Sequence, residues 1–266
     1  MPRPCQVVRV FTIGDSGGNH LGVINDRSGL DDHAMATIAA ELGFSETVFV
    51  DWFDGPPTVR IFTPELELPF AGHPLVGAAW VLARLGPAAA AGTLRCRAGD
   101  VRYRSDGDVI WIDAGELPAA VTAAADAGAD AAAARIAPPQ RAWKVTMPRD
   151  YLIFVYDSDR DVTTAFPYAP ALADRFGLVL VHFRADTDAH VRFFAPSAGV
   201  YEDPATGSAA VALAHALRHE GKASGRLTIA QGAEMGRPSR IELSWTPDRI
   251  EIGGTVARDG VQIVER

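Results

Sequence analysis

The chain has 266 residues, of which 48% are hydrophobic and 22% are charged, a composition typical of a soluble globular protein. Its formal net charge is 25 − 33 = −8, which disfavours a nucleic-acid partner because binding phosphates requires a basic surface. The two cysteines, Cys5 and Cys96, form neither a metal-ligand spacing nor a disulfide framework, which favours a reducing, cytoplasmic location.

The first half of the chain is predicted to be rich in strands. Gln6–Ile13 reads as a strand rather than as a secretory signal. A helix is predicted to open at Gly72, with apolar residues at helical spacing and few polar residues on any face, as in a buried helix. The apolar stretch Pro69–Leu85 is too short and too interrupted to span a membrane. Three strands are predicted after this helix: Thr93–Arg97, Val101–Arg104 and Val109–Asp113.

The second half repeats this order. An Ala-rich stretch, Pro118–Pro139, separates the halves and has room for a helix as well as the linker. A second helix is predicted to open at Gly207. The strands predicted to follow it are Arg226–Ala230, Arg240–Ser244 and Ile250–Ile252, with a separate closing strand over Val256–Val264.

Three sequence matches indicate an internal duplication. Arg60-Ile61-Phe62-Thr63-Pro64 recurs as Arg192-Phe193-Phe194-Ala195-Pro196, an offset of 192 − 60 = 132. Gly72-His73 recurs as Gly207-Ser208 (207 − 72 = 135), and Leu94–Gly99 recurs as Leu227–Gly232 (227 − 94 = 133). The order is preserved and the offsets are close to half the chain length, which predicts two copies of one fold.

The predicted fold class is α+β, with two pseudo-symmetric halves, each a strand-rich sheet around a central helix. The halves are residues 1–116 and 117–266, with the last strand free to pack on the first half.

The two repeated helix starts are candidate anion sites. A helix N-terminus offers unpaired N–H groups and partial positive charge to a carboxylate or phosphate, and Gly72 and Gly207 would allow close approach of a ligand. The alternative is that these glycines only make tight turns. The duplication favours the functional interpretation, because symmetric loops tend to meet at a shared interface, and we expect both helix starts to face one central cleft.

Acidic residues near these helices are candidates for proton transfer. Glu46 opens an apolar strand, where an apolar wall would raise its pKa into the range useful for acid/base work; the simpler alternative is a solvated glutamate at a strand edge. Asp203 lies just before the second helix, where Asp203 or Thr206 could act as a helix cap. His73, in the first helical turn, would be a neutral hydrogen-bond partner or a purely structural residue.

No resident cofactor is expected. The histidines show no metal-site pattern, Gly14–Asn19 lacks the spacing of a nucleotide-binding loop, and no nucleophile elbow for a serine is present.

Several segments together resemble the PhzF-like (phenazine-biosynthesis) isomerase family, which has the fold of diaminopimelate epimerase. The matching segments spread over most of the chain: Gly18-Asn19, Ser45-Glu46-Thr47, Phe70-Ala71-Gly72-His73-Pro74, Glu202-Asp203-Pro204-Ala205-Thr206-Gly207-Ser208-Ala209 and Gln231–Ser239. The resemblance implies a cofactor-independent proton shift on a small unsaturated, amino-acid-like carboxylate in a site between the halves. It also suggests a homodimer.

Carried over by position, the resemblance assigns Glu46 as the catalytic acid/base and places Asp203 and His73 beside it in catalysis. The substrate-binding residues it implies are Asn19, Ser45, Gly72, Gly207 and Ser208. Where the epimerase relatives have two cysteines this chain has Ala71 and Ala205, and His20 follows Asn19 where the family usually has proline. An amino-acid epimerase without the cysteine pair, and a non-catalytic small-anion binding protein, are the alternatives.

Overall fold

The computed structural model describes residues 2–26, 29–52, 55–86, 89–115, 119–147, 149–172 and 177–265. Its contacts divide the chain into two compact units, which are described separately: unit 1 is Met1–Asp113 with Gly253–Arg266, and unit 2 is Ala114–Ile252. The predicted boundary between residues 116 and 117 lies outside the described residues.

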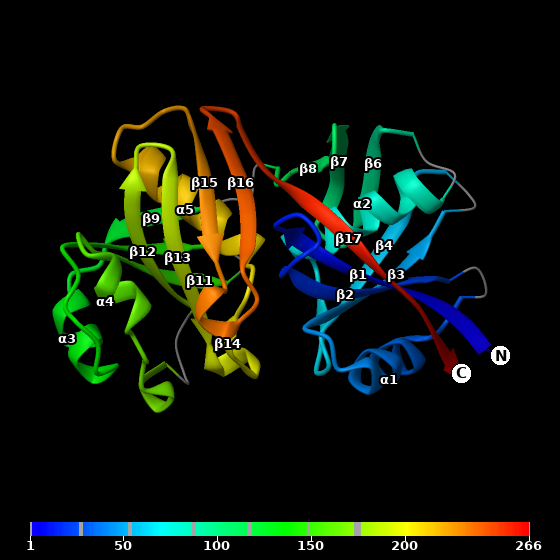
Figure 1. Ribbon diagram of the computed structural model, residues 1–266, viewed down its shortest axis with the longest axis horizontal. Helices are drawn as coiled ribbons and strands as arrows, with labels where there is room; N and C mark the ends of the chain where they lie inside the picture. Colours follow the sequence, from blue (N-terminus) through cyan, green and yellow to red (C-terminus); the bar gives the residue numbers. More distant parts are fainter. Residues whose placement is uncertain are drawn as a thin grey trace. The chain divides into compact units, whose positions relative to one another are not determined.

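In its described residues, unit 1 consists of strands and two helices (Figure 1). Its elements are β1 (Pro2–Thr12), β2 (Asn19–Asn25), α1 (Asp32–Leu42), β3 (Glu46–Asp51), β4 (Thr58–Phe62), β5 (Glu67–Leu68), α2 (Gly72–Leu85), β6 (Ala91–Cys96), β7 (Gly99–Asp106), β8 (Val109–Asp113) and the later part of β17 (Arg249–Glu265). The strand pairings run β17-β1-β2-β3-β4-β6-β7-β8, and β8 pairs in turn with β17. Unit 1 is therefore a strand-rich, barrel-like sheet.

Unit 2 is also rich in strands (Figure 1). Its elements are β9 (Ala120–Ala123), α3 (Ala127–Ala133), β10 (Arg141–Thr146), β11 (Asp150–Val155), α4 (Asp159–Thr163), the 3-10 helix η1 (Ala169–Leu172), β12 (Gly177–Ala185), β13 (Asp188–Ala195), η2 (Pro196–Ala198), β14 (Val200–Asp203), α5 (Gly207–His219), β15 (Gly225–Gln231), η3 (Ala233–Met235), β16 (Ser239–Thr246) and the first residues of β17.

The two units repeat one order of strand pairing. In unit 1, β1–β2 is antiparallel, β2–β3 parallel, β3–β4 antiparallel, β4–β6 parallel and β6–β7 antiparallel. In unit 2 the same sequence of directions runs through β10–β11, β11–β12, β12–β13, β13–β15 and β15–β16. The internal repeat of the sequence thus coincides with a repeat of topology.

The two main helices open at the predicted glycines. Ten residues of α2 are buried, and the helix contacts β1, β2, β3, β4, β6 and β8. Nine residues of α5 are buried, and that helix contacts β9, β10, β11 and β16. Burial on several sides explains why α2 has few polar residues on any face. Within the described residues, no helix is long and apolar enough to cross a membrane.

The predicted interruption between the last two strands is wrong. Ile250–Ile252 and Val256–Val264 were expected as two strands, but both lie in the single strand β17. The reason lies at Gly253, where an added Cβ would stand 2.6 Å from the Trp111 ring. This glycine allows close packing inside a continuous strand rather than interrupting it.

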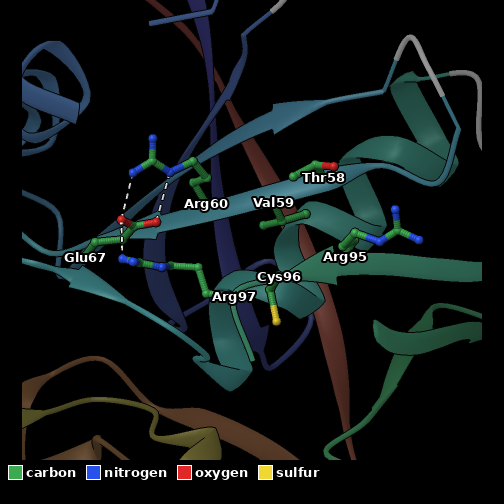
Figure 2. Close-up of a pocket in the computed structure, with 7 residues that line it drawn as sticks. All are labelled: Thr58, Val59, Arg60, Glu67, Arg95, Cys96 and Arg97. Carbon is green, nitrogen blue, oxygen red and sulfur yellow. Dashed lines mark hydrogen bonds and ion pairs between the residues drawn. The ribbon is translucent and has the colours of Figure 1, made fainter. Parts of the chain in front are cut away.

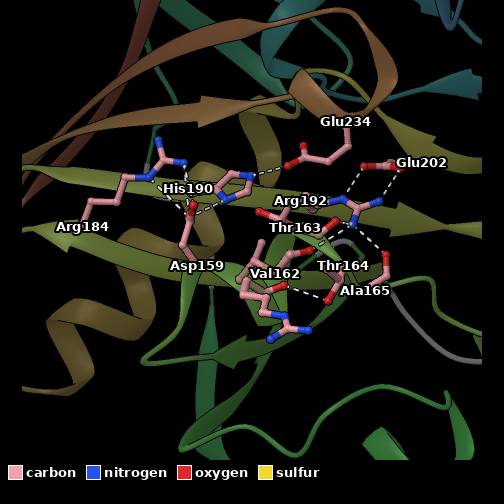
Figure 3. Close-up of polar contacts among 11 residues, drawn as sticks. Asp159, Val162, Thr163, Thr164, Ala165, Arg184, His190, Arg192, Glu202 and Glu234 are labelled. Atoms are coloured by element: carbon pink, nitrogen blue, oxygen red, sulfur yellow. Dashed lines mark hydrogen bonds and ion pairs between the residues drawn. The ribbon is translucent and has the colours of Figure 1, made fainter.

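An arginine–glutamate pair occurs at the same place in each unit. Arg60 on β4 donates two hydrogen bonds to Glu67, at 2.9 and 2.7 Å, and lies over the Phe62 ring. Arg192 on β13 donates to Glu202 at 2.7 and 2.9 Å (Figure 3). Its guanidinium group also lies over the Phe194 ring. In unit 2, Arg192 also donates to the carbonyl groups of Val162 and Thr163 at the end of α4 and of Ala165 just after it. Such two-bond pairs hold the strand that precedes each main helix.

Candidate functional site

The first cluster of predicted site residues lies in unit 1, where β2 and β3 begin side by side. Parallel pairing sets Leu21 opposite Glu46 and so brings Asn19 close to Ser45. The Ser45 hydroxyl donates to Asn19 Oδ1 at 3.2 Å, and Asn19 is only 2% exposed. The four residues after Glu46 are buried, so the glutamate stands at the open end of an apolar strand, as its sequence pattern predicts.

Glu46 meets His73 at the start of α2. Glu46 Oε2 lies 3.4 Å from His73 Nδ1, and the two side chains are 17% and 4% exposed. A carboxyl group and an imidazole at this separation can share a proton after a small adjustment. Asn19, Ser45, Glu46, Gly72 and His73 therefore form one cluster within unit 1.

The second cluster lies in unit 2, at the start of α5. Thr206 Oγ1 donates to Asp203 Oδ2 at 2.6 Å, a short hydrogen bond of the kind formed with a carboxylate. Gly207 and Ser208 follow in the first turn of the helix. The expectation that the Thr206 side chain caps this helix needs correction: Thr206 is the N-cap residue, but its hydroxyl makes no capping hydrogen bond because it is directed to Asp203.

Two residues of this second cluster were missed from the sequence. Tyr151 is 4% exposed and its hydroxyl is hydrogen-bonded to Ser208; burial raises its pKa and the bond to Ser208 works in the opposite direction. Gln231, 2% exposed at the end of β15, contacts both Asp203 and Thr206. A signal for Gln231 exists in the repeat, where a glutamine stands in place of Ala98 of the first copy.

The predicted site residues thus form two local clusters, one at each main helix start. Neither α2 nor α5 has an acidic residue in its first turn, and neither N-cap side chain accepts a hydrogen bond there. Both helix starts consequently keep the electrostatic character that suits an anion. That they face one common cleft stays a prediction.

Comparison with known proteins places the chain in a family. Residues 8–258 match the family model described as phenazine biosynthesis-like protein, PhzC-PhzF. The chain belongs to this family. It is 39% identical to an uncharacterised isomerase of Mesorhizobium japonicum, over 89% of this chain and 88% of the relative. It is 34% identical to the trans-2,3-dihydro-3-hydroxyanthranilate isomerase of Pseudomonas aeruginosa, over 88% and 87% of the two chains.

Solved structures agree with this assignment. A predicted epimerase from Pseudomonas aeruginosa superimposes with a TM-score of 0.83 at 29% identity, covering 99% of both chains. A PhzF-family phenazine biosynthesis protein of Enterococcus faecalis has the same fold, with a TM-score of 0.83 at 22% identity over 100% of both chains. The relatives named above place this PhzF-like protein among the isomerases.

A pocket of about 340 Å³ lies elsewhere in unit 1 of this PhzF-like protein (Figure 2). It is lined by Thr58, Val59, Arg60, Glu67, Arg95, Cys96 and Arg97, none of which is a predicted site residue. Glu67 binds both Arg60 and Arg97, and Arg95 is paired with Asp100. Since carboxylates already meet all three guanidinium groups, the pocket has no strong excess of positive charge.

The cysteines are not placed for chemistry. Both are buried; burial raises the pKa of Cys5 to about 12 and also raises that of Cys96. Their thiols are therefore poor proton acceptors at neutral pH. Among the described residues, no group of three or more histidine, cysteine or acidic side chains could hold a metal ion.

Proposed function

We propose that the protein is a cofactor-independent isomerase that shifts a proton, and with it a double bond, on a small unsaturated amino-acid-like carboxylate. Glu46 is the acid/base group, His73 and Asp203 assist it, and the starts of α2 and α5 bind the anionic part of the substrate. Ser45, Asn19 and Ser208 complete the binding surface.

The observation that carries this proposal is the contact between Glu46 and His73. The carboxyl group stands at the end of a buried strand and touches an imidazole fixed in the first turn of α2. The positive end of that helix disfavours a charged imidazole. A neutral His73 would leave Glu46 as the proton acceptor and could itself relay a proton or hold a polar group of the substrate.

The substrate class follows from the helix starts together with the relatives. The N-termini of α2 and α5 suit a carboxylate because a helix start carries partial positive charge. The substrate named for the Pseudomonas aeruginosa relative, a dihydro-hydroxyanthranilate, carries a carboxylate and an amine on an unsaturated ring. Both features fit a site that has an anion-binding helix start beside a carboxyl group able to contact an amine or hydroxyl.

The reaction needs no outside reactant. Glu46 takes a proton from a carbon next to the conjugated system, the electron pair of the broken C–H bond shifts the double bond, and the protonated Glu46 returns the proton to a second carbon of the same system. No net oxidation occurs, and the enzyme ends in its starting state. Hydrogen-bond donors at the helix starts would stabilise the negative charge that develops on the substrate.

An amino-acid epimerase without a cysteine pair is the second candidate, favoured by the structural likeness to a predicted epimerase. It would exchange a proton at one carbon and leave the double bonds in place. A small-anion binding protein is the third; it would bind the same ligand without needing the Glu46 carboxylate. The finer parts of the fold description, two equivalent α+β halves each centred on one helix and assembled as a homodimer, belong to the proposal as well.

Glu46→Gln tests the proposed role. The replacement has nearly the same shape but no basic carboxylate, so the variant should melt like the parent protein and lose at least about 10²–10⁴-fold in turnover. Turnover is measured with the dihydro-hydroxyanthranilate and with other small unsaturated amino acids. Glu65→Gln, at an exposed position outside both clusters, is the matched control and should keep full activity.

The outcomes separate the three candidates. Ligand binding by Glu46→Gln with lost turnover supports the isomerase. Solvent deuterium at one carbon of an otherwise unchanged substrate identifies an epimerase. Binding without any turnover by the parent protein, unaffected by Glu46→Gln, identifies an anion-binding protein.

A further inference from the structure

The duplication allows the cluster around Asp203 in unit 2 to be compared with the equivalent positions in unit 1. Strand register sets Leu68 opposite Ile61 in unit 1 and Asp203 opposite Phe193 in unit 2, so Leu68 and Asp203 are equivalent. Ala71 and Thr206 are the N-cap residues of α2 and α5. In the repeat of Leu94–Gly99, Ala98 is equivalent to Gln231.

All three polar residues of unit 2 are therefore replaced together by apolar residues in unit 1. Leu68, Ala71 and Ala98 still support the same strand, turn and buried helix, and the Ala98 N–H donates to the Pro69 carbonyl at 3.0 Å. The fold of this turn does not require Asp203, Thr206 or Gln231. Their joint presence in unit 2 calls for a different explanation.

The hydrogen bonds of Gln231 determine which atoms donate and which accept between Gln231, Thr206 and Asp203. Gln231 Oε1 accepts from the Thr206 N–H at 3.2 Å, so the opposite atom must be the amide nitrogen. Gln231 Nε2 donates to the Asp203 carbonyl at 2.7 Å and to Thr206 Oγ1 at 3.0 Å. The single proton of the Thr206 hydroxyl is then left to donate to Asp203 Oδ2, at 2.6 Å.

We propose that Gln231, acting through Thr206, is a positioning residue that holds the Asp203 carboxyl group in its ionised form at the start of α5. This inference rests on the proposed function, in which Asp203 assists Glu46. Because the Thr206 hydroxyl can only donate to Asp203 Oδ2, it stabilises the ionised carboxylate over the protonated acid. The same hydrogen bonds fix the orientation of the Asp203 side chain. Asp203 therefore meets the substrate as a proton acceptor.

The surroundings of Gln231 hold it rigidly. Gly232 follows with φ of +78°, and an added Cβ would stand 2.6 Å from the Pro204 carbonyl oxygen. The next residues form η3, where Glu234 Oε1 lies 3.0 Å from His190 Nε2, while His190 Nδ1 lies 2.8 Å from Asp159 (Figure 3). The end of β15 is thus tied to both β13 and α4, and the amide of Gln231 has little freedom to turn away.

The test follows the Asp203 carboxyl carbon by NMR across a pH titration, with Asp203→Asn used to assign the signal. Thr206→Val keeps the shape of the side chain and removes the hydroxyl, so the pH of half-protonation of Asp203 should rise by about one unit or more. Thr206→Ser keeps the hydroxyl and should restore the parent value. Gln231→Leu should move the titration in the same direction as Thr206→Val.

Thr228→Val is the matched control. Thr228 lies on the same strand as Gln231, and its hydroxyl donates to another carboxylate, Glu242, at 3.0 Å. Its loss should leave the Asp203 titration unchanged. With a substrate in hand, the acid limb of the kcat/KM profile should move to higher pH in Thr206→Val, with a larger effect on kcat than on KM.

An Asp203 titration that is the same in folded Thr206→Val as in the parent protein overturns the proposal, even if the melting temperature falls. If Gln231→Leu fails to fold, the Thr206→Val and Thr206→Ser pair still decides. A shifted titration in a protein that isomerises none of the substrates would leave the positioning role intact and refute the proposed function instead.

Discussion

At the scale of single residues, the carboxyl groups of Glu46 and Asp203 have different surroundings and hydrogen-bond partners. Glu46 is the first residue of the buried strand β3 and contacts the His73 imidazole, whereas Asp203 accepts a hydrogen bond from the Thr206 hydroxyl. The strand pairs β2–β3 and β11–β12 are equivalent in the two units. Glu46 pairs with Leu21 in the first and Gly177 pairs with Tyr151 in the second, so unit 2 has Gly177 where unit 1 has Glu46. A side chain at Gly177 would collide with the Phe193 ring, 2.5 Å from an added Cβ.

Sequence motifs identified the residues that project from the helix starts, because those residues are contiguous with conspicuous glycines. They did not identify Tyr151 or Gln231, whose place beside Ser208 and Asp203 depends on strands far away in the sequence. The sequence leaves Asp203 and Thr206 both open as helix caps, because local capping is the usual role of such residues. The Thr206 hydroxyl donates to Asp203 instead, because the Gln231 amide already donates to its oxygen.

The cysteines give a prediction at this scale. With the pKa of Cys5 raised to about 12 by burial, roughly one thiol in ten thousand is ionised at pH 8. Folded protein at that pH should therefore resist a thiol reagent such as iodoacetamide, and treatment should leave activity unchanged. Mass spectrometry checks the labelling, with protein unfolded in denaturant as the control in which both cysteines react. Rapid labelling that abolishes turnover would favour a thiol-dependent epimerase.

At the scale of elements, the two main helices and the strands that follow each of them were readable from the sequence. The starts of α2 and α5 and the bounds of β8 agree with the prediction. The elements not foreseen include helices α1 and α4 and strands β2 and β9 to β12. The strand β17 was divided in two because a glycine is read as a break unless its packing partner, Trp111, is known.

The loop after β15 gives the element-scale prediction. Gly232 and Gly236 both have positive φ, but an added Cβ at Gly232 would meet two carbonyl oxygens within 2.6 Å, while nothing lies within 4 Å at Gly236. Gly236→Ala should cost about 1 kcal/mol of unfolding free energy. Gly232→Ala should cost about 2 kcal/mol more, because backbone must move. Denaturant unfolding of both variants checks this, and equal losses would show that the Pro204 contact is unimportant.

At the scale of the whole molecule, unit 1 is completed by a strand from the second half of the sequence. The segment after β8 forms β9, which pairs with β10 in unit 2, and β17 begins in unit 2 and pairs with β1 in unit 1. The repeat predicted two similar copies from local matches at a constant offset. The sequence leaves the last strand free to pack on the first half but does not specify its partner β1, because strand partners are chosen by long-range pairing that leaves no local signature.

The central claim is that Glu46 moves a proton within one substrate molecule, and turnover in deuterated water tests it most directly. Proton NMR of the reaction with the dihydro-hydroxyanthranilate should show the double bond migrating, with no more than one deuterium gained at the carbon that receives the proton. Glu46→Gln should lose migration and deuterium gain together while still binding the substrate. Undiminished migration in a folded Glu46→Gln protein would contradict the account and move the base elsewhere, with Asp203 the first residue to replace.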